Sequence, residues 1–416
     1  MSFRVAVCIL CLLAACTNPE PVPTEPTPAW LADHVVADTP LVVFGAGQAQ
    51  AGIDLSRSRG VVLLSDGRLA VFANDDRLLL YAAEGDSVAV LGGRGEGPGQ
   101  FRSGQLVVVG TDTLLVYDSG SRRLSWFDPD VGFLRSEVLG AEVLPRYAFP
   151  IGGTRDGRVL LTSARTLDGR LPPGIRDTAR TEADIIAVRP DSSPLSVLTF
   201  PDLLVAARQA PNGSVGTLIP DNVRYAGHAL LRLRNDTIFL IAGGSSHLEL
   251  HEVSGRLLTQ RPLDLPRASV TPEDRAALIA LQTAPLIEGN LGGHAPPPNL
   301  EATIAFMQTE PFADSFPAAD DLLLEADGSD LLVVHGGPFQ AKVWRATRLD
   351  PAGAELARIE VALPRSRPVA FSGNTVLLEM VDDDGVTTFE LRRLVARSSG
   401  SERDRPKPLP GAPEGE

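Results

Sequence analysis

The stretch RLAVFANDDRLLLYAAEGDSVAVLGGRGEGPGQFRSG, residues 68–104, decides the fold of this chain. It contains three short apolar runs of strand length and then a glycine-rich loop, after which the pattern begins again. Apolar runs recur at an interval of forty-five residues, at Leu69, Leu114 and Val159 and, near the C-terminus, at Leu331 and Val376. A fixed period of this size, filled with strands instead of helices, is typical of the blades of a β-propeller.

Length and composition agree with one all-β domain. Closed β folds with radial repeats bury a small core in each repeat, so 416 residues do not require several domains. The formal net charge is −14, and the only lysines are Lys342 and Lys407. Because a basic stripe is the electrostatic footprint of a nucleic-acid-binding protein, we expect no nucleic-acid partner.

The N-terminus has the pattern of a lipoprotein signal. Arg4 precedes an apolar segment, and the small residues Ala14 and Ala15 stand before Cys16. We predict a signal peptide over 1–15 that is cut before Cys16, whose thiol then carries a lipid and attaches the protein to a membrane of the cell envelope. The alternative is an ordinary signal peptide that happens to contain a cysteine.

Two segments flank the expected domain. Residues 16–33 are rich in proline, which predicts an extended tether of about 3 Å per residue. Residues 398–416 are rich in proline, glycine and charge, which predicts a disordered tail. No acidic residue follows Cys16 directly, and this favours the outer membrane as the place of the anchor. Since Cys8 and Cys11 leave with the signal, we expect no disulfide.

The strand pattern predicts six blades over residues 34–397. Complete blades are expected at 61–91, 105–139, 149–200, 228–264 and 318–363. The sixth blade is split between the two ends of the domain, with three strands at 368–371, 375–380 and 387–395. Its fourth strand is the segment 40–44. Pairing of this first strand with the last blade would close the ring and leave no open sheet edge.

Three insertions interrupt the repeat, at 165–183, 201–225 and 262–316. The third is the largest and falls between the fourth and fifth blades. It contains two helical patterns, one with Thr271 as N-cap before a proline at the first helical position, the other capped by Asn299. Such a helical pair covers one mouth of the ring, or it fills space against a blade edge.

The second blade carries the motif of a known repeat family. Segment 114–134, LLVYDSGSRRLSWFDPDVGFL, has the order strand, Asp, turn, Arg with an apolar residue, aromatic residue and Gly, and segment 90–101 ends in a Gly-Pro-Gly-Gln-Phe connector. These residues resemble the NHL-repeat propellers, over the first two blades and only faintly beyond. The resemblance implies a six-bladed fold with Phe101 packed between blades. It implies no single activity, because NHL-like propellers include scaffolds, ligand binders, a lyase and hydrolases.

Ligand sites of propellers lie at the mouth of the central channel, in the loops that lead into each innermost strand. Here those loops contain polar residues at 94–102, 146–148, 224–228, 320–321 and 365–367. Arg-Tyr-Ala occurs twice among them, and an arginine beside a tyrosine hydroxyl suits a carboxylate or phosphate. Candidate residues for binding a small anionic ligand or a protein are therefore Arg102, Arg146, Tyr147, Arg224, Tyr225 and His228. The alternative is that the arginines cover apolar surface with their stems.

Other polar motifs predict neither a metal nor a cofactor. His247, Glu249 and His251 alternate along an expected strand, and this donor set suits zinc, but alternation with leucine describes a half-exposed strand equally well. The run Asp-Asp-Asp-Gly at 382–385 favours a hairpin turn over a calcium site. No G-x-S-x-G nucleophile elbow occurs, and the glycines at 92–99 are not followed by the Lys-Ser/Thr of a phosphate loop.

These observations predict a lipid-anchored propeller of the cell envelope that acts as a ligand-binding or protein-interaction scaffold. The alternative, from another class, is a propeller hydrolase or lyase, lactonase-like or peptide-lyase-like, with a metal in the central channel. That alternative requires acidic and histidine side chains around the axis of the ring. The best placed are His228, Asp320 and Asp321, with His294 reaching in from the third insertion.

Overall fold

The computed structural model describes residues 32–46, 53–56, 58–86, 88–140, 148–164, 178–189, 192–209, 218–287, 299–325, 330–337, 343–350 and 353–397. These residues belong to one compact unit that begins at Ala32. As the repeat predicted, the unit is all-β, and its described part contains two helices. Neither of these helices has the length and apolar character needed to span a bilayer.

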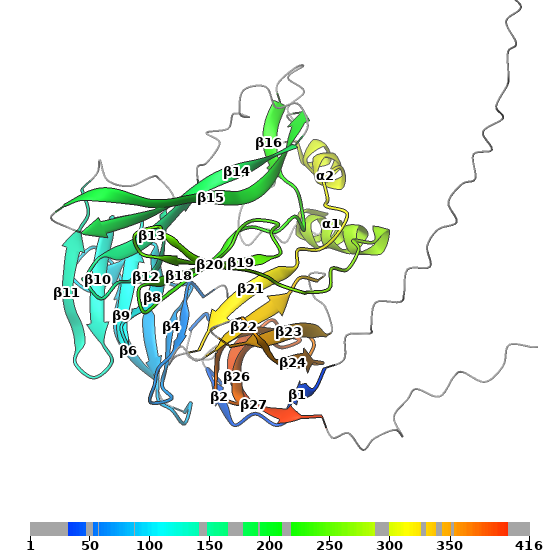
Figure 1. Cartoon of the computed structure of the whole chain (residues 1–416). Coiled ribbons are helices and arrows are strands. Elements are labelled where there is room, and N and C mark those ends of the chain that lie inside the picture. Colours follow the sequence, from blue (N-terminus) through cyan, green and yellow to red (C-terminus); the bar gives the residue numbers. More distant parts are fainter. Residues whose placement is uncertain are drawn as a thin grey trace, which may run out of the picture. The chain divides into compact units, whose positions relative to one another are not determined.

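The segment that opens the repeat forms a five-stranded sheet (Figure 1). Its strands, in hydrogen-bonded order, are β3 (Val61–Leu63), β4 (Leu69–Phe72), β5 (Leu78–Tyr81), β6 (Val88–Arg94) and β7 (Gln100–Phe101). Every residue of β4 and β5 is buried, because continuous apolar runs form strands whose two faces are both covered. Gly67 makes the turn between β3 and β4 with a φ of +87°, a conformation that favours glycine.

A nine-stranded sheet follows in the chain. Its strands are β8 (Gly104–Val109), β9 (Thr113–Asp118), β10 (Arg123–Asp128), β11 (Gly132–Val138), β12 (Ala148–Gly153), β13 (Val159–Ala164), β14 (Thr178–Arg189), β15 (Ser192–Gln209) and β16 (Leu218–Asn222). Two antiparallel sets, β8 to β11 and β12 to β16, meet through their first strands, which are parallel where Gly153 faces Val109. In each set the first strand is therefore the innermost.

Two further sheets complete the unit. The first is antiparallel and contains β17 (Leu230–Arg234), β18 (Thr237–Ile241), β19 (His247–Glu252) and β20 (Leu257–Pro262). The second contains β21 (Ala319–Leu324), β22 (Leu331–His335), β23 (Trp344–Leu349), β24 (Glu355–Val361), β25 (Ser366–Ser372), β26 (Thr375–Val381) and β27 (Thr387–Ala396), together with β1 (His34–Val36) and β2 (Val42–Phe44). Strands β21 to β24 and β25 to β27 again form antiparallel sets in sequence order.

The first strands of the sets follow one another around a closed path. Contacts link β3 with β8, β8 with β12, β12 with β17, β17 with β21, β21 with β25, and β25 with β3 again. This is a propeller-type arrangement, in which the first strand of each set borders a central channel and the remaining strands lie outward.

The segment 40–44, which contains β2, pairs with the last strand, as predicted. Three residues of β2 lie opposite three residues of β27, Val42 with Leu391, Val43 with Glu390 and Phe44 with Phe389. The sequence did not predict β1, which pairs in parallel with β24 and antiparallel with β27. Two strands from the N-terminal end therefore tie the last sets of strands together.

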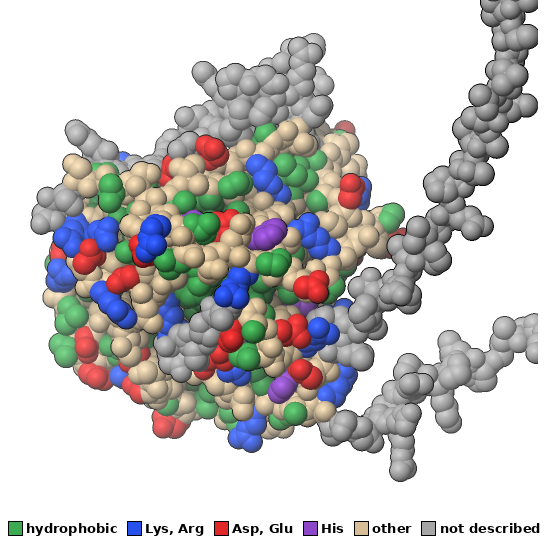
Figure 2. Space-filling view, in the orientation of Figure 1, with side chains coloured by type: hydrophobic (Ala, Val, Ile, Leu, Met, Phe, Trp, Pro, Cys, Tyr) green, Lys and Arg blue, Asp and Glu red, His purple; other side chains and the backbone are tan. Residues whose placement is uncertain are grey.

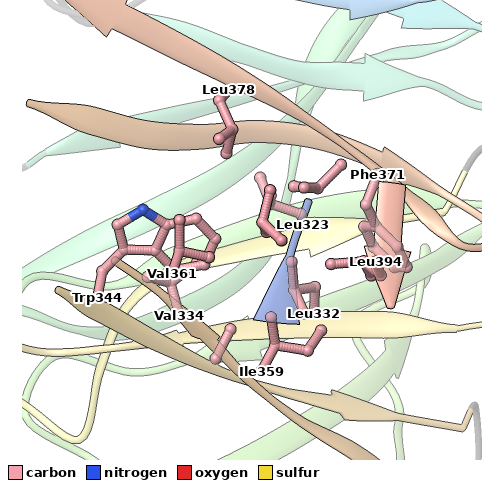
Figure 3. Packing of buried hydrophobic residues seen from close by; sticks show 12 residues of the cluster. Leu323, Leu332, Val334, Trp344, Ile359, Val361, Phe371, Leu378 and Leu394 are labelled. Carbon is pink, nitrogen blue, oxygen red and sulfur yellow. The ribbon is translucent and has the colours of Figure 1, made fainter. Parts of the chain in front are cut away.

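Apolar clusters fill the spaces between neighbouring sets. Figure 3 shows one cluster, in which Leu323, Leu332 and Ile359 of β21, β22 and β24 lie near Phe371 and Leu394 of β25 and β27. The cluster is built from valine, leucine and isoleucine with few aromatic residues, as the composition requires.

Phe101 packs between the first two sets of strands, as the resemblance implied. Its side chain is completely buried. Its ring centroid lies 5.2 Å from that of Phe72 and 5.8 Å from that of Phe127. The connector that ends in this residue therefore joins the cores of two neighbouring sets.

Helices α1 (Pro272–Ile287) and α2 (Leu300–Gln308) lie between β20 and β21 in the chain and contact each other. Thr271 caps α1 as predicted, since its hydroxyl accepts a hydrogen bond from the Asp274 N–H at 3.2 Å while the Asp274 carboxylate accepts one from the Thr271 N–H at 2.9 Å. Contrary to the prediction, the Asn299 side chain makes no capping hydrogen bond to α2.

The region 201–225, expected as a connection between blades, is partly strand. β15 continues through Pro201 and pairs with β16, so β14 to β16 form an extension that runs toward α2 (Figure 1). Pro201 ends the apolar pattern in the sequence, but the strand accommodates it at an irregularity opposite Glu182. Beyond β16, the Arg224 N–H donates to the carbonyl of Pro311 at 2.8 Å.

Candidate functional site

Three polar side chains predicted for the channel mouth stand near the starts of consecutive inner strands. His228 precedes β17, Asp320 is the second residue of β21, and Arg367 is the second residue of β25. Because β17 contacts β21 and β21 contacts β25, these residues lie at the same end of neighbouring strands. We call His228, Asp320 and Arg367 the mouth cluster.

Asp320 is the extra residue of a β-bulge. The residues on either side of it, Ala319 and Asp321, pair with consecutive residues of β22, so Asp320 has no partner of its own in the ladder. A bulge turns its extra side chain out of the regular alternation of the strand, and bulges are frequent beside active sites. β12 and β25 have register shifts as well, but the extra residue there is apolar.

The carboxyl of Asp320 is surrounded by protein and yet keeps accessible surface. The residue is exposed, but burial among the surrounding atoms raises the pKa of its carboxyl above 3.8, and the charge of Asp321 raises it further. The charges of His228 and Arg367 lower the same pKa. Desolvation on most sides with one open side is what the wall of a narrow channel provides.

Ion pairs hold the other charges around the mouth cluster. Arg232 binds Asp321 with an N–O distance of 2.7 Å. Arg367 binds Glu379, which lies opposite it on β26, at 2.5 Å. Within the part of the chain that the structure describes, the Asp320 carboxylate and the His228 imidazole make no hydrogen bond to another protein group. Both are therefore open to a ligand.

Of the first group of predicted ligand residues, the structure describes Arg102 alone. Arg102 is exposed, forms an ion pair with Glu96, and donates its backbone N–H to Asp118 at 3.0 Å. Arg146 and Tyr147 lie outside the described residues. Figure 2 shows acidic and basic side chains interspersed over one face of the molecule, so charge there is local and mixed in sign.

Arg224 and Tyr225 contact the chain that follows α2. The guanidinium of Arg224 donates two hydrogen bonds, at 2.9 and 2.8 Å, to the buried carboxylate of Glu310. The Tyr225 ring centroid lies 5.7 Å from that of Phe312 and 4.7 Å from that of Phe316. These contacts join the extension of β14 to β16 with the helical segment, a structural role that the Arg-Tyr-Ala motif did not reveal.

His247, Glu249 and His251 do not form a metal site. His251 is buried, with Nε2 3.0 Å from Glu249 Oε2 and Nδ1 3.3 Å from the carbonyl of Gly255, whereas His247 is exposed. A register shift after Leu250 changes the alternation on which the shared face depended. Among the described residues, no group of three or more His, Cys, Asp or Glu side chains is arranged to hold a metal ion.

The acidic run after β26 is a hairpin turn, as predicted. Asp382 Oδ1 accepts a hydrogen bond from the Val386 N–H at 2.7 Å, and Gly385 has a φ of +81°. His294, named for the enzyme hypothesis, lies outside the described residues.

A separate cavity of about 390 Å³ lies between β15 and the hairpin of β18 and β19. Arg180 lines it, and desolvation by burial lowers the pKa of this guanidinium. Arg180 donates hydrogen bonds to the carbonyls of Asp202 at 2.7 Å and Ala226 at 3.1 Å. Its N–H groups thus join the backbone at Asp202 to the backbone at Ala226. No residue of the mouth cluster lines the cavity.

One feature of the mouth was missed in the sequence. Phe149, the second residue of β12, is 44% exposed, although Ala148 and Pro150 on either side are buried. An apolar residue in an apolar strand predicts core, so no signal in the sequence distinguished it.

No family model matches the chain, and no curated protein matches it. Solved structures of propeller-type proteins are similar. A gluconolactonase from Xanthomonas campestris is 14% identical, with 88% of this chain and 99% of that chain covered and a TM-score of 0.39. A virginiamycin B lyase from Staphylococcus aureus is 9% identical over 82% and 97% of the two chains, with a TM-score of 0.39. Regucalcin from Agrobacterium tumefaciens is 12% identical over 88% and 95%, with a TM-score of 0.34. Likenesses at this level assign no activity to this chain.

Proposed function

We propose that this protein is a propeller-type hydrolase or lyase in which Asp320 and His228 transfer protons. The observation that carries the proposal is the carboxyl of Asp320, which stands in a bulge, keeps accessible surface and has a raised pKa. Carboxyls perturbed in this way in a cleft or channel are typical of catalytic acids and bases. A hydrolase or lyase, the alternative hypothesis from the sequence, therefore fits better than a scaffold without a reacting site, and the channel metal of that hypothesis is not part of this proposal.

In the proposed reaction Asp320 acts as the general base. Its raised pKa makes the carboxylate a stronger base than an ordinary aspartate. It takes a proton from an attacking water in a hydrolase, or from a carbon beside a carbonyl group in a lyase. His228 gives a proton to the leaving group. Exchange with solvent then removes the proton from Asp320 and returns one to His228.

Substitution of Asp320 tests this proposal. The purified chain is assayed against lactones, glycosides and peptides, and we expect turnover that falls about a hundredfold or more in Asp320→Asn. The control is Asp384→Asn, which changes an exposed aspartate in a turn. Full turnover by Asp320→Asn would overturn the assignment. Loss of turnover on addition of a chelator would indicate that the reaction depends on a metal and not on acid–base catalysis by the protein alone.

The pH dependence of turnover gives an independent test. The general base must be ionised, so the rate should fall as the pH is lowered through the pKa of Asp320. Because burial raises this pKa, the acid limb of the profile should lie above 3.8, the ordinary value for aspartate. A limb at or below that value would contradict the assignment of Asp320 as base.

The second candidate is a propeller that binds a ligand without converting it. The pairs of Arg232 with Asp321 and Arg367 with Glu379 favour it, because they fix charges around the mouth as a recognition site requires. Chromatography of the ligand after incubation distinguishes the two candidates, since a pure binding module returns it unchanged.

We also propose that the ring has six blades of the NHL-like type, with α1 and α2 inserted between the fourth and fifth. The closed order of inner-strand contacts, the pairing of β2 with β27 and the place of the helices between β20 and β21 support this. One blade is assigned to each inner strand in that order. An experimental electron-density map with a different number of inner strands would exclude this layout.

The N-terminal sequence supports one more proposal, that Cys16 carries a lipid and anchors the protein in the cell envelope. Acyl chains on one residue hold a protein at a membrane without a spanning helix. Mass spectrometry of the mature N-terminus tests this. We expect a lipid-modified cysteine as the first residue, and an unmodified N-terminus at another position would contradict the anchor.

A further inference from the structure

Two more side chains at the mouth stand at the same level as Asp320. Phe149 is the second residue of β12 and Arg367 is the second residue of β25, as Asp320 is of β21. Inner strands of a propeller run in one direction along the channel, so their second residues lie at one end of it. In the order of contacts, β17 and β21 stand between β12 and β25. The proposed acid–base pair therefore lies between the phenyl ring and the guanidinium.

Arg367 is anchored on one edge only. Glu379 accepts hydrogen bonds from its Nε at 3.2 Å and its Nη2 at 2.5 Å, both through the same carboxylate oxygen. Nη1 makes no hydrogen bond within the described residues, and 65% of the side chain is exposed. A guanidinium has five N–H donors in a planar fork that matches a carboxylate. The anchored fork therefore keeps donors for a carboxylate of a ligand.

Phe149 offers an apolar surface to the same ligand. Ala148 and Pro150 are buried and point to the same side of β12, whereas Phe149 points to the opposite side. The side of β12 that carries Phe149 is therefore partly uncovered, near the start of the strand. An apolar group of a ligand placed against this ring would remove both surfaces from water.

We propose that the substrate of this site is an organic carboxylate with an apolar group, whose carboxylate binds Arg367 and whose apolar group covers Phe149. This inference rests on the proposed function and adds the class of substrate. The bond to be cleaved then lies between the two anchored ends, beside Asp320 and His228.

Three probes test the inference, and two of them each lack one feature of the third. Isothermal titration of the full chain compares phenylbutyrate with butyrate, which lacks the ring, and with phenylbutanol, which lacks the charge. We expect phenylbutyrate to bind about tenfold more tightly than either. Arg367→Ala should lower its affinity to that of phenylbutanol, and Phe149→Ala should lower it to that of butyrate. Arg367→Lys keeps the charge without the fork and should restore only part of the affinity.

Matched control variants exclude general effects on folding. Arg256→Ala removes another exposed arginine that is paired with a glutamate, and Leu257→Ala removes another exposed apolar side chain. Both should bind phenylbutyrate as the unchanged protein does, and circular dichroism verifies that every variant is folded. The inference is overturned if no probe binds, if the three probes bind equally, or if the controls lose as much affinity as the mouth variants.

The same experiment separates this inference from the proposed function. Asp320→Asn should still bind phenylbutyrate, because it changes neither anchoring residue. If phenylbutyrate fails to bind while turnover depends on Asp320, only the substrate class is wrong. If phenylbutyrate binds as expected while Asp320→Asn keeps full turnover, only the assignment of the base is wrong.

Discussion

The buried imidazole of His335 makes the stability of the protein depend on pH. Its Nε2 lies 2.8 Å from the Thr347 hydroxyl. Desolvation by burial lowers its pKa from 6.5 to about 4, and the charges of Arg345 and Arg358 act in the same direction. The fold therefore favours the neutral ring, whereas the unfolded chain takes up a proton below its pKa of 6.5. The free energy of unfolding should fall by about 3 kcal/mol as the pH is lowered from 6.5 to 4.

Urea unfolding of the protein and of His335→Gln, each at about pH 7 and about pH 4.5, measures this contribution. Glutamine is neutral at both pH values and carries an amide that forms hydrogen bonds with hydroxyl groups. The unchanged protein should lose more stability between the two conditions than the variant does. Equal losses in the two proteins would show that His335 is not the responsible group.

Because the hydroxyl of Tyr81 is buried, we expect that its removal does not destabilise the protein. The side chain is completely buried, and the hydroxyl has no hydrogen-bond partner among the described residues. Burial raises its pKa to about 12. Because an unpaired buried polar group is destabilising, Tyr81→Phe should keep the stability or raise it by up to about 1 kcal/mol. Thermal unfolding checks this, and a clear drop in melting temperature would reveal a hidden partner of the hydroxyl.

At the scale of elements, β2 contributes more to the stability of the protein than its length of three residues suggests. Phe44 is completely buried, with its ring centroid 6.2 Å from that of Tyr81, and it lies opposite Phe389. Phe44→Ala should therefore cost about 3 to 5 kcal/mol by removing buried surface and leaving a cavity. Leu41→Ala, at an exposed neighbour, is the control. Similar stabilities of these two variants in urea would mean that β2 is not packed as described.

The strands that were predicted most directly are those with an apolar run at a fixed interval. This signal located β4, β9 and β13, because a strand that is buried on both faces consists of a continuous apolar run. The segment that became β2 does not follow the interval and was found from its own apolar run before a glycine-rich loop. The missed features depend on residues far apart. β1 has only three residues, and its place is set by β24 and β27.

The candidate site was predictable to a smaller extent. His228 and Asp320 were found because the sequence predicts loops before the inner strands at these positions; His228 does precede β17, whereas Asp320 is already the second residue of β21. The bulge at Asp320 was not found, because a bulge is defined by its pairing with β22. The pair of Arg224 with Glu310 joins residues 86 positions apart, and no local pattern carries such information.

For the whole molecule, closure of the ring depends on its two ends. The sets of strands contact mainly their neighbours, as in repeat proteins, so an open ring would expose the edge of its last set. The N-terminal segment prevents this with β2 on one part of β27 and β1 on another. Arg392 adds a link, because its guanidinium donates to the carbonyl of Ala37 at 2.9 Å.

Two deletions test this dependence. Removal of residues 1–31 leaves the compact unit, which begins at Ala32, and should not change the melting temperature. Removal of residues 1–46 also takes away β1 and β2, uncovers Phe389 and frees an edge of β27. The second variant should lose the single cooperative transition and aggregate at lower temperature, because an unpaired strand edge and exposed apolar surface promote association. Calorimetry and light scattering compare the two variants, and identical transitions would mean that the ring closes without its N-terminal strands.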